Sequence, residues 1–286
     1  MKEAVVIIPH YNDVWRLTRC LKALVPQLPD TVDLVVVDNA STDSLEALRA
    51  EFADVRIVTE TKKGAAEARN RGVLESTAPA LFFLDCDCVP DADWIETALR
   101  IKDQADVIGG RIEVFDETPA PRSGAEGFET VFAFQNRRYV EEKGFSVTAN
   151  LLTRRDVFEK TGPMRAGLSE DLEWCHRAQA QGFGISYAEE LGVSHPTRGD
   201  WQALARKWQR LTEESFGVHK KTGRSNLSWA LRGLAMPASA LLHSLKVLRH
   251  GALAGGGERW AAVQTLWRLR LTRMVWMLRQ SLGVSL

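Results

Sequence analysis

The first half of the chain alternates short, wholly apolar runs with segments of helical periodicity. Runs without interspersed polar residues are typical of strands that are buried on both faces of a parallel sheet. The pattern predicts strands at 4–8, 34–37, 55–58 and 81–84, and helices at 14–25, 43–50 and 65–74. Strands that alternate with helices of about ten residues indicate βαβ units. We therefore predict an α/β fold with an open, mostly parallel sheet flanked by helices.

The second half of the chain shows a mixed pattern followed by a purely helical one. Extended segments are predicted at 107–114, 146–153 and 185–188, a Pro/Gly-rich loop at 118–127, and helices at 131–142 and 171–181. Beyond residue 196 the strand signal ends, and helices are predicted at about 200–216, 227–249 and 258–281. The pattern thus predicts a sheet domain at 1–196 and a C-terminal helical appendage at 197–286.

Formal charge separates the same two parts. The whole chain carries 37 Lys and Arg against 37 Asp and Glu, so its net charge is zero. Residues 1–196 carry 22 basic and 33 acidic side chains, a net of −11, whereas residues 197–286 carry 15 and 4, a net of +11. Six of the nine tryptophans also lie beyond residue 200. Such a split suggests a different partner for each part, although attraction between the two parts would also produce it.

Composition excludes several classes of protein. With 45% hydrophobic and 26% charged residues, the chain is neither disordered, collagen-like nor a disulfide scaffold. Its four cysteines form no CxxC pair and no zinc-ligand spacing, which indicates reduced thiols and a cytoplasmic location. The apolar run near the first residue is too short for a signal peptide.

Two carboxylates, Asp85 and Asp87, directly follow the predicted strand that ends at residue 84. Carboxylates one residue apart at a strand end can present oxygens to one hard divalent cation, and turn-forming carboxylates are the alternative. The same spacing recurs at Asp91 and Asp93, but there it precedes a helical pattern and is typical of helix capping. We therefore predict a metal site at the first pair.

A second candidate group begins where the strand at 34–37 ends. Asp38 leaves this buried strand at the sheet edge, where its carboxylate could accept hydrogen bonds from a nucleobase or a ribose. Ser41, Thr42 and Asp43 follow it. These three residue types are common helix N-caps, so we predict that they cap the next helix.

Two further groups belong to predicted helices. Arg69, beside Asn70, has a planar guanidinium that can pair with phosphate or hold a base; a surface arginine paired with Glu67 or Glu75 is the alternative. Glu170 and Asp171 stand at the start of the helix predicted at 171–181. One of these two acids could serve as a general base, although either acid alone would more simply be a helix cap.

Taken together, these groups resemble the motifs of a family-2 glycosyltransferase with the GT-A (Rossmann-like) nucleotide-diphospho-sugar fold. The matching segments are IPHYN at 8–12, VDNASTD at 37–43, ARNRG at 68–72, FLDCDCVP at 83–90, GG at 109–110, TANLLTRRDVF at 148–158, SEDLEWCHRAQAQG at 169–182 and VSHP at 193–196. They occur in the order and with the spacing of that family over about residues 4–196. The full set of motifs in this order is more specific than any one motif alone.

The resemblance implies a role for each matching position. The residues expected in the nucleotide-sugar pocket are Pro9, Tyr11, Asn12, Asp38, Arg69, Asn70 and Asp85. The residues expected at a divalent metal, Mn²⁺ or Mg²⁺, are Asp87, Asp85 and His195. Asp171 resembles the catalytic base, with Glu170 beside it.

The implied activity is transfer of a hexosyl group, with inversion, from a nucleotide-diphospho-sugar donor to a hydroxyl of a glycan or lipid-linked acceptor. A UDP-sugar is the expected donor, and polysaccharide biosynthesis of the cell envelope is the expected setting. Ala40 stands where the family often has Gly, and Lys62 and Lys63 replace a smaller polar stretch. These departures concern the preference for the nucleobase and not the fold.

Two alternatives use the same kind of fold. A sugar-nucleotide-forming nucleotidyltransferase usually opens with a Gly-rich basic loop after its first strand, and the segment IPHYND at 8–13 offers none. A catalytically silent scaffold is the second alternative, and the intact acids Asp85, Asp87 and Asp171 argue against it.

The C-terminal region is basic and amphipathic. Its longest uncharged piece, residues 233–245, is 13 residues long, whereas a spanning helix needs about 20. An apolar stripe recurs at helical spacing and is flanked by arginines: Trp260, Val263, Trp267, Leu271, Met274 and Leu278. This pattern favours a helix lying in the interface of an anionic membrane, and hence a peripheral location on the inner face of the cell membrane.

Two protein–protein arrangements would produce the same stripe. The helix could pack on the catalytic domain, or it could form a homodimer interface. Nucleic-acid binding is disfavoured because Trp and Leu form a stripe instead of alternating with the cations as stacking platforms.

Overall fold

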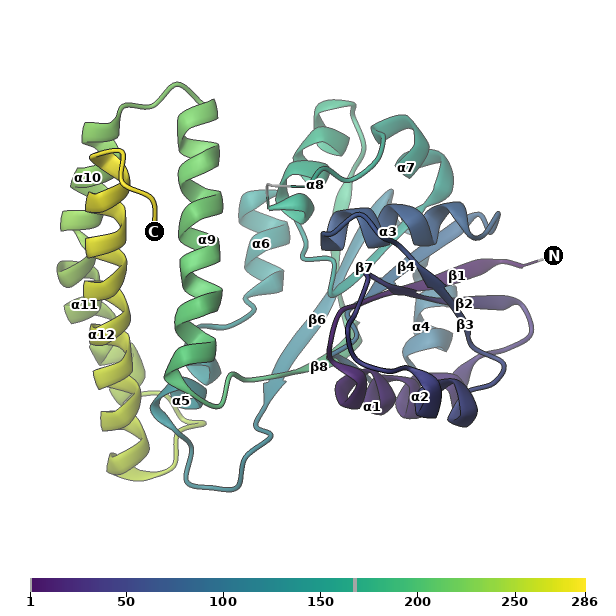
Figure 1. Cartoon of the computed structure of the whole chain (residues 1–286), viewed down its shortest axis with the longest axis horizontal. Helices are drawn as coiled ribbons and strands as arrows, with labels where there is room; N and C mark the ends of the chain where they lie inside the picture. Colours follow the sequence, from purple (N-terminus) through teal and green to yellow (C-terminus); the bar gives the residue numbers. More distant parts are fainter. Residues whose placement is uncertain (1, 167–168) are drawn as a thin grey trace. The chain divides into compact units, whose positions relative to one another are not determined.

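The computed structural model describes residues 2–166 and 169–286. These residues form two compact units (Figure 1): unit 1 comprises Met1–Glu113 and Gln135–His195, and unit 2 comprises Val114–Phe134 and Pro196–Leu286. The division into domains at 1–196 and 197–286 stays a prediction. In the structure, residues 114–134 belong to the same unit as the C-terminal helices. These segments are far apart in the sequence, and no local sequence pattern predicts that they fold together.

Unit 1 is built on an eight-stranded sheet with the order β3-β2-β1-β4-β7-β6-β8-β5. The strands are β1 (Ala4–His10), β2 (Val32–Asp38), β3 (Arg56–Thr59), β4 (Ala80–Leu84), β5 (Val89–Pro90), β6 (Val107–Phe115), β7 (Asn150–Arg154) and β8 (Ile185–Pro196). Strands β3, β2, β1 and β4 pair in parallel, whereas β7 runs antiparallel to both β4 and β6. The predicted α/β class and the four N-terminal strands are confirmed, and the antiparallel β7 makes the second half of the sheet mixed.

The helices of unit 1 connect these strands. They are α1 (Val14–Leu24), the 3₁₀ turn η1 (Val25–Gln27), α2 (Glu46–Glu51), α3 (Ala65–Leu74), α4 (Trp94–Ile101), α6 (Asn136–Lys143), α7 (Arg155–Thr161) and α8 (Glu170–Ala180). The helices predicted at 65–74 and 171–181 are confirmed within one residue at each end. The helix predicted at 43–50 begins only at Glu46, so the prediction that Ser41, Thr42 and Asp43 cap it is wrong.

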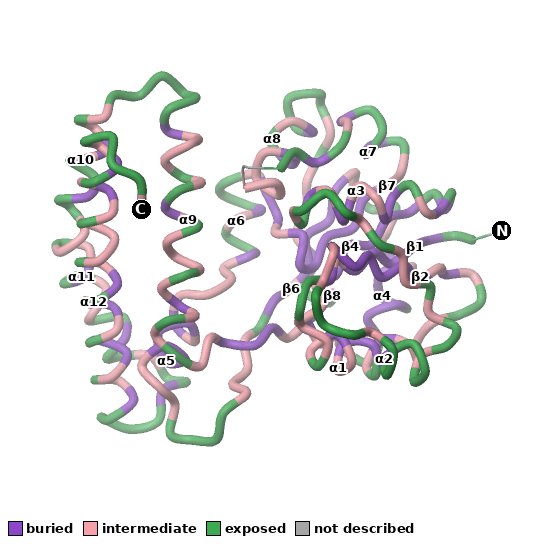
Figure 2. Tube along the Cα trace, in the orientation of Figure 1, coloured by how far each residue is buried: buried purple, intermediate pink, exposed green. Residues whose placement is uncertain are grey.

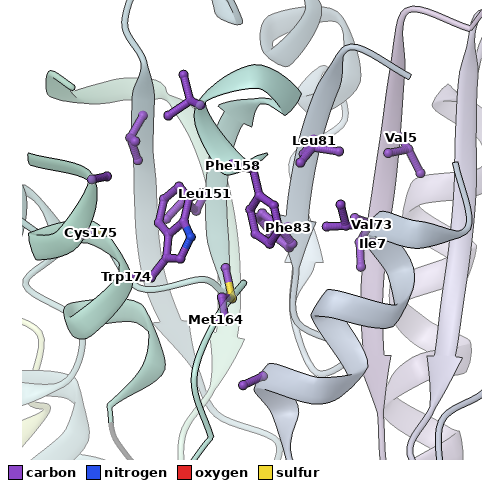
Figure 3. Packing of buried hydrophobic residues seen from close by; sticks show 14 of the residues in the cluster. Val5, Ile7, Val73, Leu81, Phe83, Leu151, Phe158, Met164, Trp174 and Cys175 are labelled. Atoms are coloured by element: carbon purple, nitrogen blue, oxygen red, sulfur yellow. The ribbon is translucent and has the colours of Figure 1, made fainter. Parts of the chain in front are cut away.

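The core of unit 1 fills the space between the sheet and the helices α3, α7 and α8 (Figure 3). Phe83 of β4 lies 6.1 Å from Phe158 of α7, and Phe158 stacks on Trp174 of α8 at 5.6 Å between ring centroids. The indole Nε1 of Trp174 donates to the carbonyl oxygen of Gly162 at 3.0 Å. Large rings that are buried and hydrogen-bonded in this way hold the start of α8 in one place.

Helix α3 approaches the sheet closely at Gly72. A Cβ atom on Gly72 would lie 2.3 Å from Cγ2 of Ile7 on β1, which is closer than two carbon atoms can pack. Only glycine therefore fits at this position. The close approach brings the residues of α3, Arg69 among them, to the end of the neighbouring strands.

Unit 2 contains α5 (Gly124–Phe132), α9 (Trp201–Lys221), α10 (Asn226–Leu234), α11 (Met236–Leu248) and α12 (Gly255–Ser281). Its core lies between α5, α9, α11 and α12 and includes Phe128, Leu204 and Leu266. Among the described residues, no helix has both the length and the apolar character that crossing a bilayer requires.

Two predictions about the start of unit 2 are wrong. Residues 118–127 are not all loop, because α5 begins at Gly124 behind a capping box: Ser123 Oγ accepts from the Glu126 N–H, and Glu126 Oε2 accepts from the Ser123 N–H. The Ser-x-x-Glu spacing that marks such a box is visible in the sequence. The helix predicted at 131–142 is interrupted, since α5 ends at Phe132 and α6 begins at Asn136.

The long helix predicted at 227–249 is also divided. Helices α10 and α11 meet at Ala235, and Pro237 lies in the first turn of α11. Proline has no N–H to continue the hydrogen bonding of the preceding helix, and the first turn of a helix is where it is tolerated.

The predicted apolar stripe of α12 is partly internal. Val263 belongs to the core of unit 2 and Trp267 packs against it, with its Nε1 donating to Ser244 Oγ at 3.1 Å. Trp260 and Leu271 are exposed. The flanking cation Arg273 lies over the ring of Trp208, and burial lowers its pKa to about 10. The stripe therefore does not form one continuous exposed face.

Candidate active site

Three candidate residues, together with one histidine, lie at the carboxyl ends of neighbouring parallel strands. His10 ends β1, Asp38 ends β2, and Asp85 and Asp87 follow β4 directly. Strand β1 lies between β2 and β4 in the sheet, with His10 in register with Asp38. Open α/β sheets bind their ligands at this edge, and binding of a ligand by these residues stays a prediction.

The carboxylate of Asp38 is held by a histidine that the sequence reasoning did not assign. His10 Nδ1 lies 3.1 Å from Asp38 Oδ1, and the backbone N–H of Asp13 donates to His10 Nε2 at 3.1 Å. Since Nε2 accepts a hydrogen bond, the proton of a neutral imidazole lies on Nδ1 and is donated to Asp38. The signal available in the sequence was a histidine two residues after the strand predicted at 4–8.

Asn12 organises the loop that follows β2. Its Oδ1 accepts from the N–H of Thr42 at 2.8 Å and from the N–H of Asp43 at 3.3 Å. The N–H of Asn12 in turn donates to Ser41 Oγ at 3.0 Å. These bonds explain why residues 41–43 form a loop instead of capping α2. Asn12 is expected in the nucleotide pocket, and it also fixes the backbone of the loop at 41–43.

Tyr11 and Pro9 flank this region. Tyr11 is exposed, and Lys63 Nζ lies 3.3 Å from its hydroxyl and 5.0 Å from its ring centroid. Pro9 lies within β1, opposite Val37. An exposed aromatic ring beside a strand end is a surface on which a planar base can stack.

Asn39 is a second residue that the sequence reasoning missed. Its Nδ2 donates to the carbonyl oxygens of Glu60 and Lys62, and its Oδ1 accepts from the N–H of Gly64 at 2.7 Å. Gly64 has a φ of 131°, a value that favours glycine. The side chain of Asn39 therefore fixes the loop that leads into α3.

Arg69 joins two of the predicted groups. Its guanidinium is 4% exposed; Nη2 lies 2.6 Å from Asp85 Oδ1, and Nη1 lies 2.9 Å from Glu170 Oε1. Burial by itself lowers the pKa of Arg69, but the carboxylates of Asp85 and Glu170 outweigh it and raise the pKa. The alternative partners are excluded, because Glu67 pairs with Lys62 and Glu75 pairs with Arg71.

Asn70 uses its side-chain amide within the protein. Its Nδ2 donates to the Met164 carbonyl at 2.9 Å, and its Oδ1 accepts from the Met164 N–H at 2.9 Å. This two-fold bond ties the segment before α8 to α3. A nucleotide contact by Asn70 stays a prediction.

Asp87 and His195 meet at the same edge of the sheet. His195 Nε2 on β8 lies 3.1 Å from Asp87 Oδ2, and the imidazole is buried. The other acid pair behaves differently: Asp91 accepts from Arg111 Nη2 at 2.7 Å, and Asp93 occupies the N-cap position of α4 without a side-chain capping bond. The two Asp-x-Asp pairs thus have different surroundings, although Asp93 makes no capping bond, and metal binding by the first pair stays a prediction.

The donor atoms at Asp87 fit a divalent cation. No group of three or more His, Cys, Asp or Glu side chains suited to a metal occurs in residues 2–166 and 169–286. One carboxylate and one imidazole are ligands that Mn²⁺ accepts, and such ions often take few protein ligands when phosphate oxygens complete the shell. Asp85 differs from Asp87 because its Oδ1 is paired with Arg69.

The cysteines near these acids are not nucleophiles. All four cysteines are free, and burial followed by the charge of Asp87 raises the pKa of both Cys86 and Cys88 well above the ordinary value. A thiol with a raised pKa stays protonated and unreactive at neutral pH.

Asp171 has the electrostatic character of a base. Burial, followed by the negative charge of Glu170, raises the pKa of Asp171 to about 6. Its Oδ1 accepts from the N–H of Leu172 at 2.7 Å and from Ser169 Oγ at 3.2 Å. Trp174, one turn further along α8, fixes the position of the helix. A carboxylate whose pKa lies near neutrality is well suited to accept a proton.

Comparisons with known proteins identify the family of the chain. The family model described as "Glycosyl transferase family 2" matches residues 5–162, which is more than half of the chain. "Glycosyltransferase AglE" of Haloferax volcanii is 28% identical over 215 residues, covering 71% of this chain and 70% of AglE.

Two solved structures share the fold. One is the mannosyltransferase PcManGT from Pyrobaculum calidifontis in complex with GDP-Man and Mn²⁺, with a TM-score of 0.56, 18% identity, and coverage of 98% of this chain and 73% of that protein. The other is S. aureus TarS 1–349 in complex with UDP-GlcNAc, with a TM-score of 0.56, 16% identity, and coverage of 99% and 93%. The sheet is a GT-A fold, and the chain belongs to glycosyl transferase family 2.

Proposed function

We propose that the protein is an inverting, metal-dependent hexosyltransferase. It takes a sugar from a nucleotide-diphospho-sugar and attaches it to a hydroxyl of a glycan or lipid-linked acceptor. The observation that carries this proposal is the ion-pair chain from Asp85 through Arg69 to Glu170, which ends beside Asp171. It connects Asp85, an acid expected to bind the nucleotide-sugar donor, with Asp171, whose raised pKa suits proton transfer.

Asp171 acts as the general base in this mechanism. Its carboxylate accepts the proton of the acceptor hydroxyl while the hydroxyl oxygen attacks the anomeric carbon. The bond from that carbon to the diphosphate breaks, and the nucleoside diphosphate leaves with the bonding electrons. No covalent intermediate with the protein is needed, and the raised pKa of Cys86 and Cys88 is consistent with this.

The donor is held at the ends of β1, β2 and β4. Asp38 accepts from the base, with His10 fixing the direction of its carboxylate, and Tyr11 offers its ring for stacking. A carboxylate acceptor suits the N–H edge of uracil, and we propose a UDP-sugar. The structural relatives in complex with UDP-GlcNAc and with GDP-Man support a nucleotide-diphospho-sugar in general.

Asp87 and His195 would hold the divalent cation, Mn²⁺ or Mg²⁺, with Asp85 beside them. When bound, the cation neutralises negative charge on the leaving diphosphate. Arg69 keeps Asp85 oriented toward the donor. Because Arg69 also pairs with Glu170, Asp171 is the acid that accepts the proton. The complex of PcManGT with Mn²⁺ supports use of a metal.

The acceptor and the location are linked in the proposal. A cationic, Trp-rich C-terminal region suits work at an anionic membrane surface, on the inner face of the cell membrane, in polysaccharide biosynthesis of the cell envelope. Unit 2 carries 16 basic and 8 acidic residues, a net of +8.

A panel of nucleotide-sugars tests the proposal directly. Each donor is incubated with the full chain with and without Mn²⁺, and thermal stabilisation and release of the nucleoside diphosphate are measured. We expect one UDP-sugar to stabilise the protein in the presence of the metal and to be hydrolysed slowly. Stabilisation by nucleoside triphosphates with release of pyrophosphate would instead identify a nucleotidyltransferase.

A further inference from the structure

Helices α10 and α11 expose a series of leucines. The side chains lie between 42% and 71% exposed, and we call them the leucine face: Leu227, Leu231, Leu234, Leu241, Leu242, Leu245 and Leu248. Apart from the adjacent pair Leu241 and Leu242, their spacing of three or four residues places them on one side of each helix. Exposed stretches accordingly recur along both helices in Figure 2. Clustered leucines on a surface mark an interaction site, whereas scattered single ones are ordinary.

The opposite side of both helices is already packed. Trp229 of α10 is buried, and its Nε1 donates to Gln280 Oε1 of α12 at 3.0 Å. Ala240 and Val247 of α11 belong to the same core as Leu266 of α12. The leucine face is therefore not the side by which these helices join the fold. It is a second apolar side, which the core of unit 2 leaves exposed.

The segment that carries the leucine face has charge of one sign. Residues 215–257 contain no Asp or Glu. The same segment contains six exposed Lys and Arg residues, which are Lys220, Lys221, Arg224, Arg232, Lys246 and Arg249. A basic segment that exposes leucines is complementary to an anionic lipid leaflet, whose headgroups attract the cations and whose acyl region accepts the leucines.

We propose that the leucine face of α10 and α11 is the surface by which the protein lies on an anionic membrane. The inference rests on the membrane association proposed above, and it names the residues that enter the lipid. It also moves the contact from the stripe of α12, where Val263 and Trp267 pack internally, to the two preceding helices.

The dimensions of α11 suit this orientation. Its 13 residues span roughly 20 Å at 1.5 Å per residue, which is less than the hydrocarbon thickness of about 30 Å. The helix can therefore lie in the interface but cannot cross it. A second copy of the chain is a poorer occupant, because a two-fold interface would place the basic segment of one copy against that of the other.

Vesicle sedimentation of the full-length protein tests the proposal. We expect binding to vesicles that contain phosphatidylglycerol and much weaker binding to pure phosphatidylcholine. The double variant Leu241→Ser with Leu245→Ser should bind the anionic vesicles at least about tenfold more weakly, because two leucines no longer leave water. Both positions are exposed, so circular dichroism should show an unchanged fold.

Matched variants separate this surface from general effects. Leu242→Ser should weaken vesicle binding, whereas Leu74→Ser, a similarly exposed leucine on α3 of unit 1, should not. Lys246→Glu with Arg249→Glu should weaken binding at low salt more than Arg49→Glu with Arg100→Glu, which changes the net charge by the same amount. Raised salt should reduce the charge effect and leave the leucine effect.

Three outcomes would overturn the proposal. The first is no binding of the wild-type chain to anionic vesicles, and the second is equal binding by the Leu241→Ser/Leu245→Ser variant. The third is a wild-type dimer that the same variant dissociates, since the face would then belong to a second copy. Nucleoside diphosphate release in lipid-free solution is measured in parallel, so that failure of the membrane surface and failure of the catalytic proposal remain distinct.

Discussion

The candidate site of unit 1 pairs charged groups around a buried guanidinium, whereas α10 and α11 of unit 2 leave leucines on their surface. Buried charge is not confined to unit 1, since Glu126, Glu129 and Glu258 of unit 2 are buried as well. In unit 1, the buried guanidinium of Arg69 bridges Asp85 and Glu170, and His195 meets Asp87 at 3.1 Å. In unit 2, the seven leucines of the leucine face remain in water although a core lies directly behind them. Each arrangement is unfavourable to stability by itself, because burying charge costs desolvation and exposing leucine costs hydration.

The candidate site and the leucine face thus both lower stability, the first by burying charge and the second by exposing apolar side chains. A site needs charges that are held in place before the substrate arrives, so charged groups are buried and paired. A surface for lipid needs apolar groups that find their partner only outside the protein. Departures of this kind are expected where function is located. The two units should therefore respond independently to mutation, and four experiments can test this independence.

The largest effect is expected for Asp171→Asn. Loss of the base should lower turnover about 10²- to 10⁴-fold, while binding of the donor changes little. Vesicle binding through unit 2 should be the same as in the wild type. Product formation at saturating donor, together with calorimetric titration of the nucleoside diphosphate, measures the two quantities. Surviving turnover with lost donor binding would place Asp171 in the donor site, with Glu170 as the next candidate base.

The two faces of the helices in unit 2 should differ sharply in stability. Leu266→Ala removes a fully buried side chain and should lower the free energy of unfolding by about 2–5 kcal/mol. Leu242→Ala, on the leucine face, should change it by about 0.5 kcal/mol or less. Urea unfolding followed by tryptophan fluorescence reports on unit 2, where six of the nine tryptophans lie. Equal losses would mean that the leucine face is packed in solution.

Metal-dependent binding should distinguish two acids of the same segment. Asp87→Ala should weaken the Mn²⁺-dependent binding of UDP by about 10- to 100-fold, since it removes a carboxylate beside His195. Asp93→Ala, an exposed acid of the second Asp-x-Asp pair, is the control and should leave it unchanged. Calorimetry with and without Mn²⁺ measures the difference. Retained metal dependence in the first variant would contradict the assignment of Asp87.

The smallest expected effect is a pH-dependent gain in the stability of the Asp171→Asn variant over the wild type. Because the folded protein raises the pKa of Asp171 to about 6 from 3.8, the folded state binds the proton more tightly than the unfolded chain does. Wild-type stability should therefore fall as the pH rises from about 4 to 6, and the cost is complete above pH 6. Asp171→Asn removes this cost while keeping an acceptor oxygen for the Leu172 N–H.

The variant should accordingly be more stable than the wild type by about 1–3 kcal/mol at pH 8 and similar to it at pH 4. Thermal unfolding at the two pH values checks the sign. The turnover of the wild type should decline as the pH drops through about 6, because protonated Asp171 cannot accept a proton. A variant that is less stable than the wild type at both pH values would show that the carboxylate is paired in the fold.

Much of unit 1 was predictable from local pattern. The runs at 4–8 and 81–84 became β1 and β4 because a strand buried on both faces must be apolar at every position. Asp85 and Asp87 could be separated from Asp91 and Asp93 because only the first pair follows such a strand. The capping box at Ser123 and Glu126 was equally readable and was overlooked.

Further features depended on contacts between distant residues. The sequence placed Arg69 near a phosphate or an adjacent acid, but its partners Asp85 and Glu170 are 16 and 101 residues away. Asn12, expected only in a binding pocket, also holds the loop at Thr42, which removed the helix caps predicted there. Hydrogen bonds of this kind follow from chain topology and leave no periodic signal.

Local sequence was enough to set the class of fold, the parallel strands and the acids at their ends, because strand burial and strand-end position are local properties of an apolar run. Only packing in three dimensions settled which charges pair and which apolar faces remain in water. The helices α10, α11 and α12 all carry enough Leu and Trp to be buried, so the pattern could not tell one face from another. A hydrophobic side chain is buried only where another element covers it, and the packing of α10 and α11 on α12 leaves their leucines outside.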